Sequence, residues 1–126
     1  MLQIKNYIGG HLHDAINHHQ LENTNPTTGK VYSLLPDSDK EDVEAAVTAA
    51  EAAFEKWSNT PAEDRCKIML RIADMIDAKL DHLSAIESTD QGKPFKLART
   101  VDIPRAASNF RFFATAALQF ASESHH

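Results

Sequence analysis

The sequence predicts an α+β fold that is mainly helical, with short antiparallel strands followed by three helices. Two observations support this prediction. Turn residues and brief apolar runs fill residues 1–37, whereas apolar residues recur at helical spacing through residues 38–126. The chain has 126 residues, the usual length of one domain. We therefore expect a single folded region, residues 1–126, with two parts of different local structure.

Two turn signals predict hairpins in the first part. Gly9-Gly10 separates the apolar residues around Ile8 from residues 11–14. Pro26 and Gly29 lie in the second signal, Asn25-Pro26-Thr27-Thr28-Gly29, where a fixed and a positive φ reverse the chain. Because an isolated two-stranded ribbon is marginal in water, we expect these strands to need a partner surface.

The first helix is predicted to begin at a capping box. In that motif Ser38 and Glu41 would each accept a hydrogen bond from a free backbone N–H. One continuous apolar stripe at helical spacing follows. Its members are Val43, Ala46, Val47, Ala50, Phe54 and Trp57.

The second helix is predicted to start at Thr60 as hydroxyl cap, with Pro61 in its first turn, and to run without interruption to a stop at Gly92. A third helix starts near Phe95, with Pro104 forcing a kink or a restart. The expected apolar stripe of the second helix is Met69, Ile72, Ala73, Ile76, Leu80, Leu83 and Ile86; the inner face of the third is Phe110, Phe113, Ala114, Ala117 and Leu118.

Charge and composition disfavour several classes of protein. Thirteen Lys and Arg against eighteen Asp and Glu give a net charge of −5, which argues against nucleic-acid binding. No apolar run is long enough to cross a bilayer, and no signal peptide is visible. The single cysteine suits a reducing compartment. We expect a cytoplasmic protein that does not bind nucleic acid or membranes.

Five motifs in order resemble the amino-terminal part of the NAD(P)-dependent aldehyde dehydrogenase superfamily, over essentially the whole chain. They are Asn25-Pro26-Thr27-Thr28-Gly29, Ala45 to Trp57, Arg65, Ile72-Ala73-Asp74, and Glu87 with Asp90-Gln91-Gly92-Lys93-Pro94. The stretch Asp102 to Ala114 is similar to the branch that oxidises 2-aminomuconic and 2-hydroxymuconic semialdehydes. The resemblance implies a part of the α/β coenzyme-binding domain.

The resemblance also implies an activity: oxidation of an aldehyde to an acid with NAD(P)⁺, through a catalytic Cys, an activating Glu and an oxyanion-holding Asn. In the family these groups and the phosphate-binding glycine loop come later in the sequence. We therefore expect this chain to be a fragment that is inactive alone and binds no NAD(P). The alternative is a non-enzymatic helical module that self-associates through exposed apolar faces.

Three residues are candidates for binding by resemblance. Arg105 would face the substrate tunnel and hold a substrate carboxylate by two parallel hydrogen bonds; otherwise it is a solvated helix residue. Asp90 would help to hold a structural Na⁺ or K⁺ together with the backbone carbonyl of Thr24; otherwise it is an exposed acid near a helix end.

Two further features have simpler interpretations. Four histidines, His11, His13, His18 and His19, invite a zinc site, but no acidic or cysteine ligand has the matching spacing, so we expect exposed loop histidines. Cys66 lies between Arg65 and Lys67, where a thiolate could be stabilised. No neighbouring histidine could act as its base, and we expect a structural or surface thiol.

Overall fold

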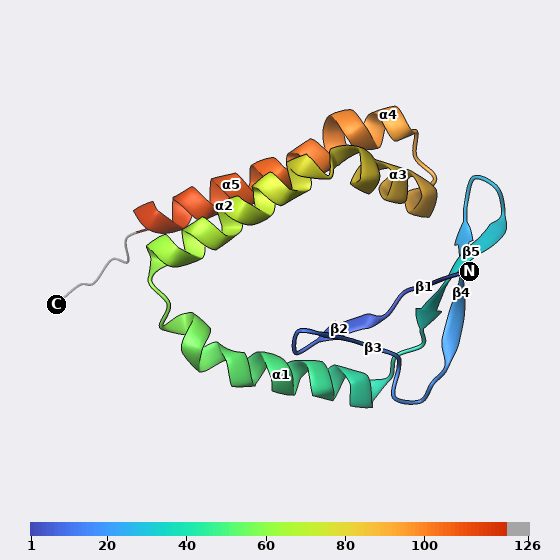
Figure 1. Cartoon of the computed structure of the whole chain (residues 1–126), viewed down its shortest axis with the longest axis horizontal. Coiled ribbons are helices and arrows are strands. Elements are labelled where there is room, and N and C mark those ends of the chain that lie inside the picture. The colour runs from blue at the N-terminus through green and yellow to red at the C-terminus, as the bar shows by residue number, and fades with distance from the viewer. Residues whose placement is uncertain (121–126) are drawn as a thin grey trace. The chain divides into compact units, whose positions relative to one another are not determined.

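The computed structural model describes residues 1–120 and divides the chain into two compact units, Met1–Asn59 and Thr60–His126 (Figure 1). In the part described, the first unit holds the strands and helix α1, and the second holds the other helices. Local structure changes from strand to helix at residues 37–39, but the boundary between the units comes only after α1.

The first predicted hairpin is formed by β2 (Asn6–Ile8) and β3 (His11–His13), which pair antiparallel. Its two-residue turn is Gly9-Gly10, and both glycines have positive φ, 59° and 89°. Two successive positive φ values match the twist of the flanking strands, which explains why glycine occupies both positions.

The second predicted hairpin also forms, from β4 (Gln20–Asn25) and β5 (Lys30–Pro36). A third strand, β1 (Leu2–Gln3), pairs with β5, so the sheet order is β1-β5-β4. The β1–β5 pairing is parallel, whereas the sequence predicted antiparallel strands alone. The β2–β3 hairpin and the turn between β4 and β5 lie between the two paired strands, and no local signal shows that β1 and β5 run in the same direction.

Helix α1 (Lys40–Ser58) does begin at a capping box, but one residue later than predicted. Asp39 is the cap residue, and its side chain accepts from the N–H of Glu41. Asp42 accepts from the N–H of Asp39 at 3.1 Å. The predicted partner Ser38 instead accepts a hydrogen bond from the side chain of Asn6 at 2.7 Å. The Ser38 side chain is therefore hydrogen-bonded to the β2–β3 hairpin and does not form the capping box of α1.

The second predicted helix is two helices, α2 (Ala62–Ala78) and α3 (Leu80–Gln91). The chain breaks at Lys79, where φ is −109° and ψ is 18°. Lysine is a good helix former, so local helix propensity does not explain the break. The start also differs by one residue, because Pro61 and not Thr60 is the cap residue of α2.

Gly92 ends α3 as predicted, in the left-handed conformation with φ 72°. The last helical stretch comprises α4 (Phe95–Leu97), the π-helix η1 (Ala98–Asp102) and α5 (Ile103–Gln119). The Pro104 ring would collide with the carbonyl four residues earlier in a regular α-helix. A π-turn directly before Pro104 relieves this conflict, so the predicted kink takes the form of a locally widened helix.

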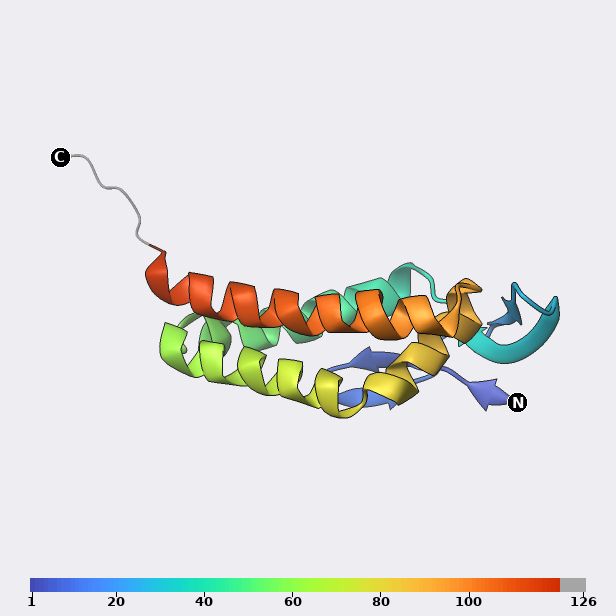
Figure 2. The same ribbon diagram turned by 90° about the horizontal axis from the view of Figure 1, so that it is seen from above.

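Helices α2 and α5 lie side by side and run in opposite directions (Figure 2). The residues buried on them are small, namely Ala73 and Cys66 on α2 with Ala107 and Ala114 on α5. Small side chains let two helix axes approach closely. Among residues 1–120, no helix is both long and apolar enough to cross a membrane.

The apolar stripe of α1 and the predicted inner face of α5 are largely exposed, whereas on α2 and α3 Ala73 is buried and Ile76 and Leu83 are half-buried. On α5, Ala114 is buried, but Phe113 is 60% exposed and Leu118 is 46% exposed. On α1, every large residue of the stripe is exposed, namely Val43, Val47, Phe54 and Trp57. Helical spacing identifies which residues share a face, but it does not show what covers that face.

Candidate functional site

Arg105 is the third residue of α5 and is exposed. Within residues 1–120 its guanidinium has neither a hydrogen bond nor an ion pair. Arginine presents several N–H donors in a planar fork that matches a carboxylate. The first turn of α5 therefore has an exposed guanidinium that no described residue pairs with.

The nearest acid along the helix is Asp102, three residues before Arg105, and it is already paired. Lys93 Nζ lies 2.9 Å from Asp102 Oδ2 and 2.8 Å from Glu87 Oε1. The Lys93 and Asp102 side chains are only 28% and 33% exposed. Hydrogen bonds to Glu87 and then to Asp102 raise the pKa of Lys93 above its usual range. We call these three residues the Lys93 bridge.

The Lys93 bridge connects α3 and the turn after it with the end of the π-helix. Ser88 strengthens the same turn, because its hydroxyl donates to the carbonyl of Lys93 at 2.7 Å. A second ion pair joins Arg99 in the π-helix to Asp81 in α3. The π-helix is thus attached to α3 at both ends, and the first turn of α5 continues directly from it.

The two predicted cation ligands lie in different units. Asp90 is half-buried in the last turn of α3, where its Oδ2 accepts from the Gln91 side chain at 3.1 Å. Thr24 is exposed on β4, beside an irregularity in the pairing with β5. Each ligand is described within its own unit, and the cation site stays a prediction.

The glycines of the described region do not fit a dinucleotide phosphate. Three of them, at positions 9, 10 and 29, lie in the hairpin turns, and Gly92 ends α3. A phosphate cradle needs glycines between a strand and the start of a helix. Between β5 and α1 the chain instead has Asp37-Ser38-Asp39, and two carboxylates repel a phosphate. No residue described here is assigned to NAD(P).

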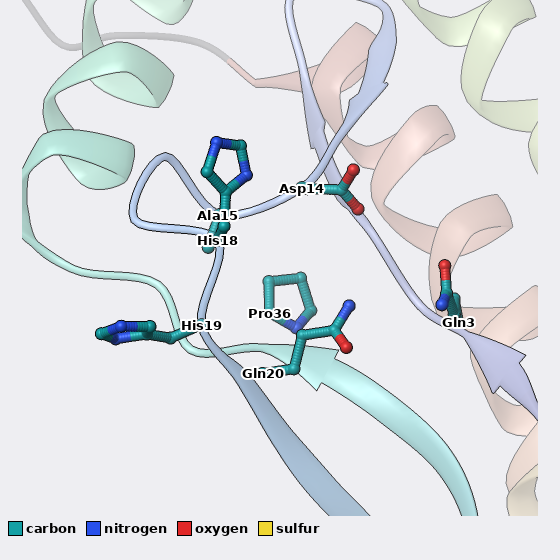
Figure 3. A pocket seen from close by; sticks show the side chains of 7 residues that line it. All are labelled: Gln3, Asp14, Ala15, His18, His19, Gln20 and Pro36. Carbon is teal, nitrogen blue, oxygen red and sulfur yellow. The ribbon is translucent and has the colours of Figure 1, made fainter.

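The histidines do not converge on a metal. His18, with φ 59°, and His19 line a hollow of about 220 Å³ together with Asp14 (Figure 3). Their imidazole rings point in different directions. Residues 1–120 contain no group of three or more His, Cys, Asp or Glu side chains that could hold a metal ion. Cys66 is buried in α2 and free of disulfides, as expected of a structural thiol.

Sequence reasoning did not identify the Lys93 bridge. Its members are six and nine residues from Lys93, across a helix end and a π-turn. Charge pairs along one helix are three or four residues apart, so that spacing rule does not find them. The only signal was local: Lys93 stands between a helix-stopping glycine and a proline.

The chain matches the aldehyde dehydrogenase family over residues 13–126. It belongs to this family. Among curated relatives, the 2-aminomuconic semialdehyde dehydrogenase of Bos taurus is 46% identical over 123 residues, 98% of this chain and 25% of the relative. The human enzyme of the same name is 40% identical over the same shares. Acetaldehyde dehydrogenase 2 of Cupriavidus necator is 42% identical over 112 residues, which are 89% of this chain and 22% of that protein.

Solved structures of aldehyde dehydrogenases share the fold. A protein from Burkholderia cenocepacia described as an aldehyde dehydrogenase matches with a TM-score of 0.92 and 36% identity, over 95% of this chain and 24% of its own. The NAD⁺ complex of the aldehyde dehydrogenase from Bacillus cereus matches with a TM-score of 0.93 and 30% identity, over 98% and 26%. The chain spans about a quarter of the length of the relatives it matches.

Proposed function

We propose that this chain forms the substrate-carboxylate-binding part of an NAD(P)-dependent dehydrogenase that oxidises a carboxylate-bearing semialdehyde to an acid. The observation that carries the proposal is the unpaired, exposed guanidinium of Arg105 at the start of α5. Relatives named for 2-aminomuconic semialdehyde, 40–46% identical to this chain, support this substrate class.

Arg105 would act by binding and orientation. Two parallel N–H···O bonds fix both the position and the direction of a carboxylate, so the aldehyde at the other end is presented in one orientation. A neutral aldehyde offers no such contact. In the complete enzyme the bound NAD(P)⁺ would accept the hydride, and no residue of this chain is assigned to that step.

Catalytic inactivity of the 126-residue chain belongs to the same proposal. The thiol that this chain possesses, Cys66, is buried on α2 and is not an accessible nucleophile. Purified chain supplied with NAD⁺ or NADP⁺ and a semialdehyde is expected to produce no NAD(P)H absorbance at 340 nm above a protein-free control. Turnover that disappears in the Cys66→Ser variant would contradict the proposal.

Substrate selection is tested in a complete dehydrogenase made by joining residues 1–126 to the remaining three quarters of the Bos taurus enzyme. Arg105→Ala should lower kcat/KM for a carboxylate-bearing semialdehyde by about tenfold or more, the loss of a charged hydrogen-bonding group. It should leave a neutral aldehyde of similar length unaffected. Arg71→Ala on α2 is the matched control, because Arg71 is also an exposed helix arginine.

An unchanged kcat/KM for the semialdehyde in Arg105→Ala would refute the proposed role.

A cytoplasmic location and the cation site of Asp90 with the Thr24 carbonyl are further parts of the proposal. A cation held by these two groups would stabilise the complete enzyme, so Asp90→Ala should abolish any rise in melting temperature that K⁺ gives over a choline salt.

The second candidate function is self-association through apolar helix faces. It is favoured by large exposed side chains in the second unit, where Phe112 and Phe113 are 64% and 60% exposed. Such faces seldom stay bare in a soluble protein. Analytical ultracentrifugation of the 126-residue chain should then show dimers or larger species, which Phe113→Lys converts to monomers. A folded wild-type monomer would contradict this candidate.

A further inference from the structure

We propose that Lys93 determines substrate specificity by holding Asp102 away from Arg105, so that the Arg105 guanidinium stays free for a substrate carboxylate. This inference rests on the proposed function and assigns a role to a residue outside the substrate contact. Lys93 is a positioning residue in this proposal, since it acts on Arg105 only through Asp102.

Helix geometry places Asp102 within reach of Arg105. Residues three apart on a helix lie on the same face, with Cβ atoms about 5–6 Å apart, close enough for an Asp and an Arg to pair. Asp102 and Arg105 have this spacing, and the backbone from Asp102 onward is helical. An isolated helix with this sequence would therefore pair Asp102 with Arg105 and neutralise the arginine.

In the folded chain the pairing is different. Asp102 Oδ2 accepts from Lys93 at 2.9 Å, and no hydrogen bond or ion pair joins Asp102 to Arg105 among residues 1–120. Lys93 is held in place by its second carboxylate, Glu87 at 2.8 Å, and by the Ser88 hydroxyl on its own carbonyl. The Lys93–Asp102 pair is therefore held in place by more contacts than an Asp102–Arg105 pair would be.

The charges agree with this assignment. Lys93 is one cation shared by two carboxylates, and both lie within hydrogen-bond distance of its Nζ. Removing the cation would leave Glu87 and Asp102 both unneutralised. Because Asp102 is only three residues from Arg105, its carboxylate would then turn to that guanidinium and compete with the substrate.

The first test uses the 126-residue chain and needs no activity. NMR of the Arg105 Nε–H group would be compared between the wild type and Lys93→Met. We expect the Arg105 signal to shift as the guanidinium gains a carboxylate, and the shift to disappear in Lys93→Met with Asp102→Asn. An Arg105 signal that Lys93→Met leaves unchanged would overturn the proposal. Lys67→Met is the control, since it breaks a comparable Lys–Asp pair on α2.

The second test measures specificity in the joined dehydrogenase described above. Lys93→Met should reduce the ratio of kcat/KM for the carboxylate-bearing semialdehyde over the neutral aldehyde by about two- to fivefold. This is the effect expected of one exposed ion pair, here the competing pair of Asp102 with Arg105. Asp102→Asn should leave this ratio unchanged or raise it. The double variant should recover the wild-type ratio.

The direction of the Asp102→Asn effect separates this proposal from a purely structural role. If the Lys93 bridge served only to hold the π-helix in place, Asp102→Asn would lower the ratio as Lys93→Met does, and that result would overturn the inference. If Lys93→Met fails to fold, Asp102→Asn alone still decides, because the two roles predict different results for it.

Failure of this inference and failure of the proposed function are distinguishable. Should Arg105→Ala leave the substrate ratio unchanged, the proposed function fails. Should Arg105→Ala lower the ratio while Lys93→Met does not, only the role of Lys93 fails. In the Arg105→Ala background, Lys93→Met should have no further effect on the ratio.

Discussion

Arg111 on α5 forms ion pairs with two acids on α2, and its Nη2 lies 2.7 Å from Asp74 Oδ1. The same nitrogen is 2.7 Å from Asp77 Oδ2. Hydrogen bonds to Asp74 and then to Asp77 raise the pKa of Arg111, so it stays charged at any pH where the protein is folded. One planar group thus connects two antiparallel helices at two points one turn apart.

Replacing Arg111 by lysine should weaken this connection. A lysine side chain is shorter than that of arginine and its ammonium is more strongly hydrated, so we expect Arg111→Lys to weaken the two carboxylate contacts and to lower the melting temperature by a few degrees, roughly. Salt screens charge pairs of this kind, so the difference from the wild type should shrink in 1 M NaCl, roughly the level where the Debye length is 3 Å. Arg71→Lys on α2 is the control, and equal effects of the two substitutions would contradict the prediction.

The buried carboxylate of Asp42 should contribute more than its neighbours on α1. Its Oδ1 accepts from the N–H of Ile16 and its Oδ2 from the N–H of Asp39, both at 3.1 Å, and the residue is 4% exposed. Asp42→Ala leaves two N–H donors without a partner and should cost about 2 kcal/mol of unfolding free energy. Urea titration followed by circular dichroism measures this loss.

The control for that variant is Glu41→Ala, because Glu41 is exposed in the same helical turn. We expect a change within about 0.5 kcal/mol, as for most surface substitutions. If Glu41→Ala were as costly as Asp42→Ala, the capping box would be the one predicted from the sequence, with Ser38, and not the one described.

The close approach of α2 and α5 should not tolerate a larger residue at Ala114. Ala114 is fully buried on α5. Ala114→Leu adds three carbons to a filled contact and should cost about 1–3 kcal/mol through strain. Thermal unfolding of this variant is compared with that of Ala117→Leu, at an exposed site three residues later on the same helix. A stable Ala114→Leu protein would mean that the two helices are not closely packed there.

Alkaline pH should weaken the attachment of α3 to the π-helix. The pKa of Lys93 is raised in the folded chain, so the bridge contributes its full stability below the unfolded value of 10.5 and loses it as pH rises through the folded pKa. The melting temperature of the wild type should therefore fall above about pH 10.5, where free lysine titrates. The Lys93→Met protein should show a smaller fall over the same range.

The pKa of Lys67 is raised in the same direction by its hydrogen bond to Asp64. Lys67→Met therefore provides the comparison for the alkaline titration. The pair is more exposed than the Lys93 bridge, so water and salt screen it more strongly. An alkaline fall that disappears in Lys67→Met and persists in Lys93→Met would contradict the assignment.

Several elements could be predicted from the sequence because their causes are local. The turn at Gly9-Gly10 needs two positive φ values, and the helix stop at Gly92 needs one, and glycine adopts them without strain. Pro104 cannot continue a regular helix, so a disturbance was predictable there, but its form as a π-turn was not. The family was also readable, since its motifs appear in order along the chain.

Other features depend on residues distant in sequence. The break at Lys79 and the parallel pairing of β1 with β5 have no local signal. The cap residue of α1 is Asp39 and not the predicted Ser38. The Ser38 hydroxyl instead accepts a hydrogen bond from Asn6, which is 32 residues away in the sequence. The apolar faces of α1 and α5 were correctly placed on single faces, but their exposure depends on packing.

The sequence alone determined that this chain is helical after residue 38, that it has the motifs of aldehyde dehydrogenases, and that Arg105 directly follows Pro104 on the last helical stretch. Tertiary structure decided whether that arginine is free. Asp102 is three residues from Arg105 in the chain, and local geometry would pair them. Folding places Lys93 and Glu87 beside Asp102, and the nearer, half-buried cation takes the carboxylate.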